Sequence, residues 1–275
     1  MIGGTVVIGG GTGFIGTALT SLLRYSGYNV TVVSRMPGRS SITWSDLATQ
    51  GLPKDTTAVI SLAGQNILDR KRQWNDGFKQ TVKASRINTT RALAQAIEKA
   101  PIKPKVFIST SGVGYYPPSP DKEYTEDSIA GKGDYFAELC TEWEAAAKLP
   151  DGIDVRQVII RSGVVLGRRG GMIAELYWPF FFGLGGPVGS GKQYLPWIHI
   201  HDISRLFLFA MEEEKVESGV LNGVAPNLIT SRQFASAFGY GLLRPAIIPM
   251  PELMANVLFG PERATMLLQG QKVIP

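Results

Sequence analysis

Cysteine and histidine are scarce in this chain of 275 residues, which contains one cysteine, Cys140, and two histidines, His199 and His201. A single cysteine excludes an intramolecular disulfide, so nothing in the cysteine usage demands an oxidising compartment. One thiol and two imidazoles are also too few for a metal site built on those ligands, and we expect no metal centre.

A long apolar run is missing as well. The most apolar window, residues 172–189, is interrupted by Glu175, by Pro179 and by several glycines, so its backbone would not be satisfied across a bilayer. We predict a buried part of a lobe, or a loop, and no membrane span. The N-terminus lacks the basic start, apolar stretch and cleavage site of a secretory signal. We therefore expect an intracellular protein, in the cytoplasm or the mitochondrial matrix.

The excess of positive charge is small, with 28 Lys and Arg against 23 Asp and Glu and a net charge of +5. The basic residues are scattered and form no stripe of the kind that follows a nucleic-acid backbone. We expect no nucleic-acid partner, and a cofactor with several phosphates requires less positive charge than a DNA groove does.

In the first half of the chain, short β-branched runs alternate with longer amphipathic stretches. This pattern predicts an α/β fold, a Rossmann-type doubly wound parallel sheet of about six or seven strands with helices on both faces. Because the runs are continuously apolar, the strands are expected to be covered on both sides. We expect strands at residues 5–8, 29–33, 58–62, 105–109 and 155–160, and helices at 15–26, 78–100 and 134–148.

The amino-acid composition changes after about Gly163, where glycines and aromatic residues become frequent. We predict a smaller C-terminal α/β lobe that contains a helix near 204–213, an Asn-Gly turn at 222–223 and a helix from residue 231. The expected domains are a cofactor-binding domain at 1–165 and a substrate lobe at 166–275, with residues 196–212 packing back on the first domain. We also expect that a further C-terminal strand or helix is missing from this chain.

Five glycines fall within residues 9–16, between the first predicted strand and the first predicted helix. In that context a glycine run indicates dinucleotide binding. We expect Gly10 and Gly11 to permit the tight turn, Gly13 to let the backbone approach the pyrophosphate, and Gly16 to let helix and strand pack closely. The alternative is a tight turn without a ligand.

The residues between these glycines, Thr12, Phe14 and Ile15, belong to the same expected cofactor loop. At the start of the helix the backbone N–H groups have no helical partner, and the helix dipole favours an anion there. The segment therefore predicts a pyrophosphate held by backbone groups.

The second predicted strand ends at Ser34 and Arg35, about twenty residues beyond the glycines, where an NAD enzyme places an acid against the ribose hydroxyls. A guanidinium pairs well with a phosphate, and a serine hydroxyl adds a hydrogen bond. The sequence therefore favours NADP(H) over NAD(H), with Arg39 as a possible helper. The alternative for Arg35 is a solvated loop arginine.

These residues resemble the short-chain dehydrogenase/reductase superfamily, in its extended, sugar-nucleotide-epimerase-like branch, whose glycine pattern is Gly-x-x-Gly-x-x-Gly. The likeness is greatest to the poorly characterised epimerase family proteins of that superfamily, and it covers essentially the whole chain. Besides the glycines and Ser34-Arg35, it is carried by Leu62-Ala63-Gly64, Trp74, Ser85-Arg86, Trp143 to Ala146, Arg161 to Gly167, Pro196 to Asp202 and Gly223 to Asn227.

The resemblance implies that the turn with Leu62 and Ala63 passes along the cofactor, that Arg86 reaches toward it, and that Val165 lies near its nicotinamide end. For Leu62, Ala63 and Val165 the alternative is ordinary core. For Arg86 it is a surface charge on a helix.

The chain departs from the superfamily in its usual proton-transfer pair, a Tyr followed four residues later by a Lys. The expected helix has Phe136 and Cys140 at the aligned positions, and no tyrosine in the sequence has a Lys at that spacing. The catalytic residues are therefore unknown from the sequence. Ser111 matches the substrate-aligning serine, with a backbone-capping hydroxyl as the alternative. Tyr115 and Tyr116 lie just beyond it, and they either reach into the nicotinamide pocket or form its walls.

Six aromatic residues, Tyr177, Trp178, Phe180, Phe181, Phe182 and Trp197, line an apolar substrate cleft or pack in the core. Two functions stay open. One is an NADP(H)-dependent oxidoreductase or epimerase-like enzyme acting on an unidentified small carbonyl or hydroxyl compound. The other is an inactive NADP(H)-binding sensor or assembly subunit with a protein partner.

Overall fold

The structure, a computed structural model, describes residues 3–38, 40–69 and 72–275. Within them, a seven-stranded sheet has the order β11-β7-β5-β4-β1-β2-β3, and all of its neighbouring strands are parallel. This order extends the 3-2-1-4-5-6 order of dinucleotide-binding sheets, which confirms the predicted Rossmann-type fold. The strands are β1 (Gly3–Gly9), β2 (Tyr28–Ser34), β3 (Ser41–Thr43), β4 (Thr56–Ser61), β5 (Val106–Gly112), β7 (Arg156–Ser162) and β11 (Gly219–Gly223).

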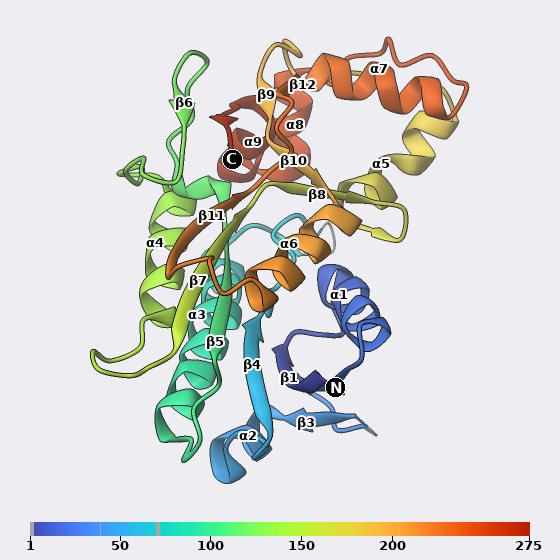
Figure 1. Ribbon diagram of the computed structural model, residues 1–275. Helices are drawn as coiled ribbons and strands as arrows, with labels where there is room; N and C mark the ends of the chain where they lie inside the picture. The colour runs from blue at the N-terminus through green and yellow to red at the C-terminus, as the bar shows by residue number, and fades with distance from the viewer. Residues whose placement is uncertain (1–2, 39, 70–71) are drawn as a thin grey trace.

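Helices cover both faces of this sheet (Figure 1). On one face, α1 (Phe14–Tyr25) and α6 (Ile200–Glu212) pack over side chains such as Val6 and Ile8. On the other, α2 (Trp44–Gln50), α3 (Asp76–Lys99) and α4 (Tyr135–Ala147) cover the alternate positions, among them Val7. Because successive strand residues point to opposite faces, the continuous apolar runs fill two separate cores.

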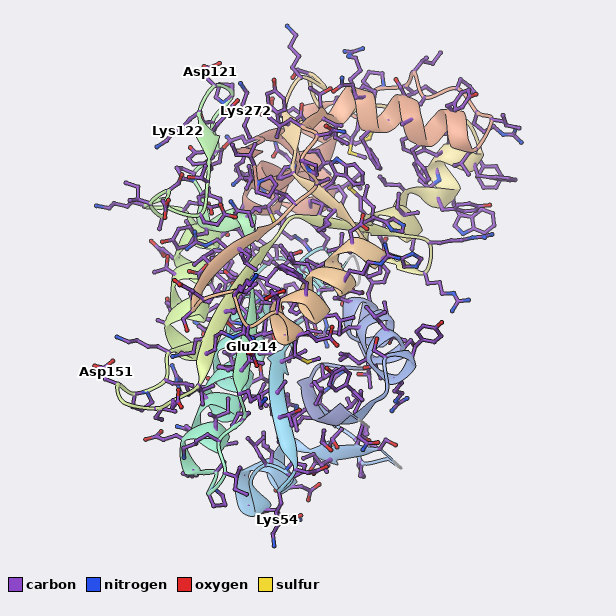
Figure 2. The ribbon with its side chains drawn as sticks, viewed as in Figure 1. Lys54, Asp121, Lys122, Asp151, Glu214 and Lys272 are labelled. Carbon is purple, nitrogen blue, oxygen red and sulfur yellow. The ribbon has the colours of Figure 1, made fainter. Side chains whose placement is uncertain are left out.

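All strands of the sheet point toward the end of the molecule where the C-terminal residues lie. Lys54 and Asp151, which precede β4 and β7, lie at the far end of the sheet, whereas Lys272 lies near Asp121 at the opposite end (Figure 2). The carboxyl ends of the strands, where ligands bind in open α/β sheets, therefore face the lobe.

The lobe combines short helices with two-stranded pairings (Figure 1). β8 (Val164–Gly167) pairs with β10 (Trp197–His199), and β9 (Tyr194–Leu195) pairs with β12 (Ile229–Thr230). Near the C-terminus, β13 (Lys272–Val273) pairs with β6 (Glu123–Tyr124), which follows the short helix η1 (Val113–Tyr115). The lobe's helices are α5 (Gly171–Phe181), α7 (Ser231–Gly241), α8 (Glu252–Phe259) and α9 (Pro261–Leu268).

The predicted Asn-Gly turn at 222–223 is wrong. Asn222 and Gly223 are the last residues of β11, which runs parallel to β7, so they do not form a turn. The connection from β7 to β11 includes α6, which lies before β11 in the chain. In the window at 172–189, the helix α5 has Phe180 as its one buried residue, so this part is neither a loop nor a buried segment. Residues 182–189 follow the helix as a loop, which is one of the two predicted alternatives. β10 ends at His199, and the Nδ1 atom of His199 accepts a hydrogen bond from the His201 backbone N–H at the start of α6.

The predicted domain boundary after residue 165 falls within β8. The segment that includes residues 196–212 contains α6, which lies on the sheet beside α1. The division into a domain at 1–165 and a lobe at 166–275 stays a prediction.

Candidate functional site

The glycine segment forms a tight loop between β1 and α1, at the point where the strand order reverses between β1 and β4. Gly10 has a φ of 83°, which L-residues rarely adopt, and a Cβ there would lie 2.7 Å from the Ala63 backbone. At Gly16 a Cβ would lie 2.3 Å from the Gly10 carbonyl oxygen. Gly10 and Gly16 are therefore required by close packing within the protein itself.

Gly13 is different, because its backbone conformation is open to any residue. Its φ is −74°, and an added Cβ would find the Gly10 carbonyl oxygen at 3.3 Å as its one neighbour within 4 Å among the described residues. The missing side chain leaves space on the exposed side of the loop. Gly13 therefore fits the expected close approach of a ligand to the backbone.

The N-terminus of α1 has no side-chain cap, and its first turn contains no acidic residue. In contrast, α3 and α4 are capped by Asn75 and Asp134, which accept hydrogen bonds from backbone N–H groups. An uncapped helix start leaves N–H donors for an anion. The exposed Thr12 lies just before these donors.

Phe14 and Ile15 begin α1 and pack against the protein. A Cβ on Gly167 or Gly170 would come within 3 Å of the Phe14 ring, so these glycines make room for it. Ile15 packs against the core between α1 and the sheet. The loop is thereby fixed to both the sheet and the segment that enters the lobe.

At the end of β2, the Ser34 hydroxyl donates to the Met36 carbonyl and accepts from the Met36 backbone N–H. This turn presents Arg35 in an exposed position, where it makes no hydrogen bond or ion pair with any residue that the structure describes. The hydroxyl therefore shapes the turn, and the Arg35 guanidinium is available to an anion. Arg39 lies outside the described residues.

Leu62 and Ala63 follow β4 and lie beside the glycine loop. The Leu62 N–H donates to the Gly9 carbonyl at 2.8 Å, which joins the ends of β1 and β4. Leu62 and Val165 both border the core without being fully buried. Leu62 and Ala63 follow β4, and Val165 follows β7, so both segments lie at the carboxyl edge of the sheet.

Arg86 is buried on α3, so a surface role is wrong for this residue. Its side chain is 9% exposed, donates to the Val82 carbonyl, and stacks over the Trp143 ring at 5.2 Å. A Cβ on Gly64 would lie 3.1 Å from Cζ of Arg86, so the turn after β4 passes directly over the guanidinium.

Burial lowers the pKa of Arg86 to about 10, so the group is still charged at neutral pH. Among the described residues, no carboxylate forms an ion pair with it. A buried cation without a carboxylate is costly unless something else compensates it. The Arg86 guanidinium is therefore a candidate contact for a ligand.

The positions expected for the Tyr-Lys pair lie together at the start of α4. Phe136 is buried against Gly114, and the Cys140 thiol lies near Gly112 at the end of β5. Burial raises the pKa of Cys140 to about 11, against smaller opposing effects of a Gly112 backbone hydrogen bond and of Arg86. The thiol is therefore neutral and unreactive at pH 7.

Ser111, on β5, is 2% exposed, and its hydroxyl makes no hydrogen bond that satisfies ordinary geometry among the described residues. Its Oγ still lies close enough to the Cys140 thiol to oppose the rise of the cysteine pKa. No backbone partner caps it, so the hydroxyl is left for another role.

A buried cluster around Arg161 was missed by the sequence reasoning. Arg161 donates from Nε and Nη2 to the two carboxylate oxygens of Glu144, at 2.9 Å each, and from Nη1 to the Tyr116 hydroxyl. Its Cζ lies 3.4 Å from the centre of the Tyr115 ring. Tyr116 also donates to Asn222 and is fully buried, and its burial raises its pKa. Tyr116 is thereby fixed in the structure, and Tyr115 stacks on the Arg161 guanidinium.

Next to the carboxyl edge lies a cavity of about 430 Å³. Val113, Phe136 and Val164 line its inner end, and Leu176, Phe180 and Phe234 contribute from the lobe. Of the six aromatic residues proposed for a cleft, Phe180 lines this cavity. The other five do not, and three of them, Tyr177, Trp178 and Phe182, are exposed.

Among the residues that the structure describes, no helix is long and apolar enough to cross a membrane. The same residues contain no group of three His, Cys, Asp or Glu side chains placed to hold a metal ion.

The comparisons with known proteins agree with this arrangement. The profile of the NAD dependent epimerase/dehydratase family matches residues 6–222. Epimerase family protein SDR39U1 of Bos taurus is 54% identical over 271 residues, which cover 98% of this chain and 91% of the bovine protein.

Two solved structures extend the likeness. The crystal structure of human epimerase family protein SDR39U1 (isoform 2) with NADPH is 54% identical, with a TM-score of 0.96 over 98% of this chain and 91% of that one. A nucleoside-diphosphate sugar epimerase from Corynebacterium glutamicum is 28% identical, with a TM-score of 0.73 over 97% of this chain and 58% of that one. The expected resemblance is confirmed, and this chain belongs to the NAD dependent epimerase/dehydratase family.

Proposed function

We propose that the protein binds NADP(H) at the carboxyl edge of its sheet and exchanges a hydride with a small carbonyl or hydroxyl compound. The observation that carries this proposal is the loop at residues 9–16, where Gly13 leaves the uncapped start of α1 open to a pyrophosphate. The human relative was crystallised with NADPH, which supports the same assignment.

Each expected residue has a role in this proposal. The backbone of Gly10, Gly11, Thr12, Gly13, Phe14, Ile15 and Gly16 forms the pyrophosphate loop. Leu62 and Ala63 border the cofactor on the next strand, and Val165 contacts its nicotinamide end. Polar groups of the cofactor compensate the buried positive charge of Arg86. When bound, the nicotinamide supplies or accepts the hydride.

The preference for NADP(H) over NAD(H) is assigned to Arg35. Its guanidinium is exposed and without a partner among the described residues, at the end of the second sheet strand. That position faces the adenosine ribose in this fold, where an arginine accommodates a 2′-phosphate. The Ser34 hydroxyl fixes the turn that presents it.

A second candidate function is NADP(H) binding without catalysis, in a sensor or an assembly subunit. It is favoured by Phe136 and Cys140, which replace an ionisable pair with groups that do not transfer protons at neutral pH. The exposed Leu253 and Val257 on α8, at 75% and 76% exposure, suit a protein partner.

The test of cofactor binding is calorimetric titration with NADPH of the wild type, of Gly13→Ala and of Gly241→Ala. A methyl at Gly13 requires a shift of a few tenths of an ångström from the Gly10 carbonyl oxygen at 3.3 Å and occupies the space meant for the pyrophosphate, so affinity is expected to fall about tenfold or more. Gly241 on α7 has no neighbour within 4 Å of an added Cβ and serves as the matched control. Equal affinity in all three proteins would contradict the proposed loop.

The two candidate functions are separated by following nicotinamide absorbance with a panel of carbonyl compounds and alcohols. Cofactor-dependent turnover supports the enzyme. Tight NADPH binding without turnover on any compound, together with a stable complex on pull-down, supports the binding protein.

A further inference from the structure

The lining of the cavity is almost free of charge. Of the lining residues in the described chain, none is Lys, Arg or His, and Asp134 is the one carboxylate. That carboxylate already accepts a hydrogen bond from the Ala137 N–H as the cap of α4. A diphosphate would bring negative charge into a cavity without a cation to pair with it.

Three arginines of the lobe form hydrogen bonds elsewhere in the protein. Arg232 donates to the Ser190 carbonyl, Arg244 to the Phe181 carbonyl, and Arg263 to the Phe259 carbonyl. None of the three lines the cavity. The wall of the cavity is therefore without a cation among the described residues, and Lys272, whose Nζ lies 5.0 Å from the centre of the lining Tyr194 ring, stays outside it.

The polar groups of the lining are mostly used within the protein. The Ser231 hydroxyl accepts from the Val188 N–H, the Thr265 hydroxyl donates to the Pro261 carbonyl, and the Gln271 amide donates to the Tyr116 carbonyl. These contacts leave the remaining wall largely apolar, with Leu176, Phe234 and Met250 among its members.

Among the lining residues that the structure describes, Gln193 has the one buried side-chain polar atom without a hydrogen-bond partner. Its Nε2 donates to the carbonyls of Val188 and Leu267, at 2.9 and 2.8 Å, and these two bonds fix the orientation of the amide. Its Oε1 is buried and has no hydrogen-bond partner among the described residues. A buried acceptor without a donor is unfavourable, so a bound molecule with a donor would stabilise it.

The rim of the cavity is apolar as well. Four apolar residues of the lining are between 42% and 63% exposed to solvent: Leu184, Ile248, Met254 and Met266. Exposed apolar side chains around an apolar cavity favour entry of an apolar molecule.

We propose that this cavity takes a compact, uncharged and mainly apolar molecule that donates one hydrogen bond to the Oε1 atom of Gln193, and that it excludes nucleoside-diphosphate sugars. The inference rests on the proposed function for the molecule's role as substrate, since Val113 and Val164 place the inner end of the cavity beside the expected nicotinamide site. Binding itself is testable without that assumption.

The experiment follows displacement of Nile red from the full chain by 4-phenyl-2-butanol, by its methyl ether and by UDP-glucose. The alcohol is expected to bind roughly tenfold more tightly than the ether, which lacks the donor, and UDP-glucose is expected not to displace the dye. Leu176→Glu should weaken alcohol binding at least tenfold, because it puts a charge in the wall. Trp178→Glu, on the same helix but outside the lining, is the control.

Equal binding of alcohol and ether, displacement by UDP-glucose, or equal losses in the two variants would each overturn the inference. Gln193→Met should abolish the advantage of the alcohol, and the wild-type comparison decides the matter if that variant does not fold. NADPH is titrated in parallel. Alcohol binding without NADPH binding would overturn the proposed function and leave the inference about the cavity standing. NADPH binding together with displacement of the dye by UDP-glucose would overturn the inference about the cavity and leave the proposed cofactor binding standing.

Discussion

Two buried arginines contact neighbouring residues of α4, Arg86 at Trp143 and Arg161 at Glu144, and their surroundings differ. Arg161 forms a bidentate ion pair with Glu144 and reaches the Tyr116 hydroxyl, and these contacts raise its pKa. Arg86 has one carbonyl partner and no carboxylate in the described structure, and burial lowers its pKa to about 10. The first arginine is satisfied by the protein, whereas the second is available to a ligand. This contrast separates a structural cation from a candidate binding cation.

The largest effect is expected at the satisfied arginine. Arg161→Met leaves the buried Glu144 carboxylate without its partner, so unfolding free energy should fall by about 3–5 kcal/mol. Urea denaturation measures this change. The double variant Arg161→Met with Glu144→Met removes both charges and should recover most of the loss. A double variant as unstable as the single one would show that the ion pair is not what the cluster requires.

Arg86→Met should behave in the opposite way. Because the guanidinium has no carboxylate to leave behind, unfolding free energy should change by less than about 1 kcal/mol. NADPH affinity should fall about tenfold if the cofactor compensates this charge. Calorimetry and urea denaturation of the same preparation measure both quantities. A large loss of stability with unchanged affinity would place Arg86 with Arg161 as a structural residue.

A smaller effect concerns Cys140, beside Arg86. With a pKa of about 11 in the folded chain against 9.0 ordinarily, the thiolate fraction at pH 8 is about a hundredfold lower than that of an unburied thiol. Alkylation by iodoacetamide should be correspondingly slow in the native protein and fast in urea. Fast native alkylation would contradict the buried position.

The same shift predicts a weak alkaline loss of stability. The unfolded thiol ionises near pH 9, while the folded one stays protonated until about pH 11, so the contribution is full below pH 9 and is lost as the pH rises toward 11. Unfolding free energies of the wild type and of Cys140→Ala, compared between pH 8 and pH 10.5, measure it. The variant should lose less stability over that interval, and parallel curves would argue against the shift.

The parts of the fold that sequence predicts are those with local causes. The first strands and the glycine loop are encoded by apolar runs and by glycines such as Gly10, whose φ of 83° requires that residue. Arg161 is separated in sequence from its partners Glu144 and Tyr116 by 17 and 45 residues, so no local pattern predicts these contacts. An Asn-Gly pair such as Asn222-Gly223 is a turn signal locally, yet pairing with β7 makes it a strand end.

The candidate site divides in the same way. Its cofactor half, from Gly13 to Arg35, lies within one βαβ unit, so it can be predicted from the spacing between the glycines and Arg35. Its cavity is assembled from segments as distant as Val113 and Met266, so its apolar lining follows from the tertiary structure. The aromatic cluster near Phe180 indicated an apolar cleft but not which of its members line it.

The most direct test of the cofactor assignment is calorimetric titration of the wild type, Arg35→Ala and Arg24→Ala with NADPH and NADH. Arg24 is an exposed arginine on α1 and controls for the loss of one surface charge. We expect Arg35→Ala to weaken NADPH binding by roughly 10- to 150-fold, which is the loss of a charge-assisted hydrogen bond, and to leave NADH binding unchanged. Arg24→Ala should bind both cofactors as the wild type does. NADH binding as tight as that of NADPH in the wild type, or equal losses in both variants, would contradict the cofactor assignment.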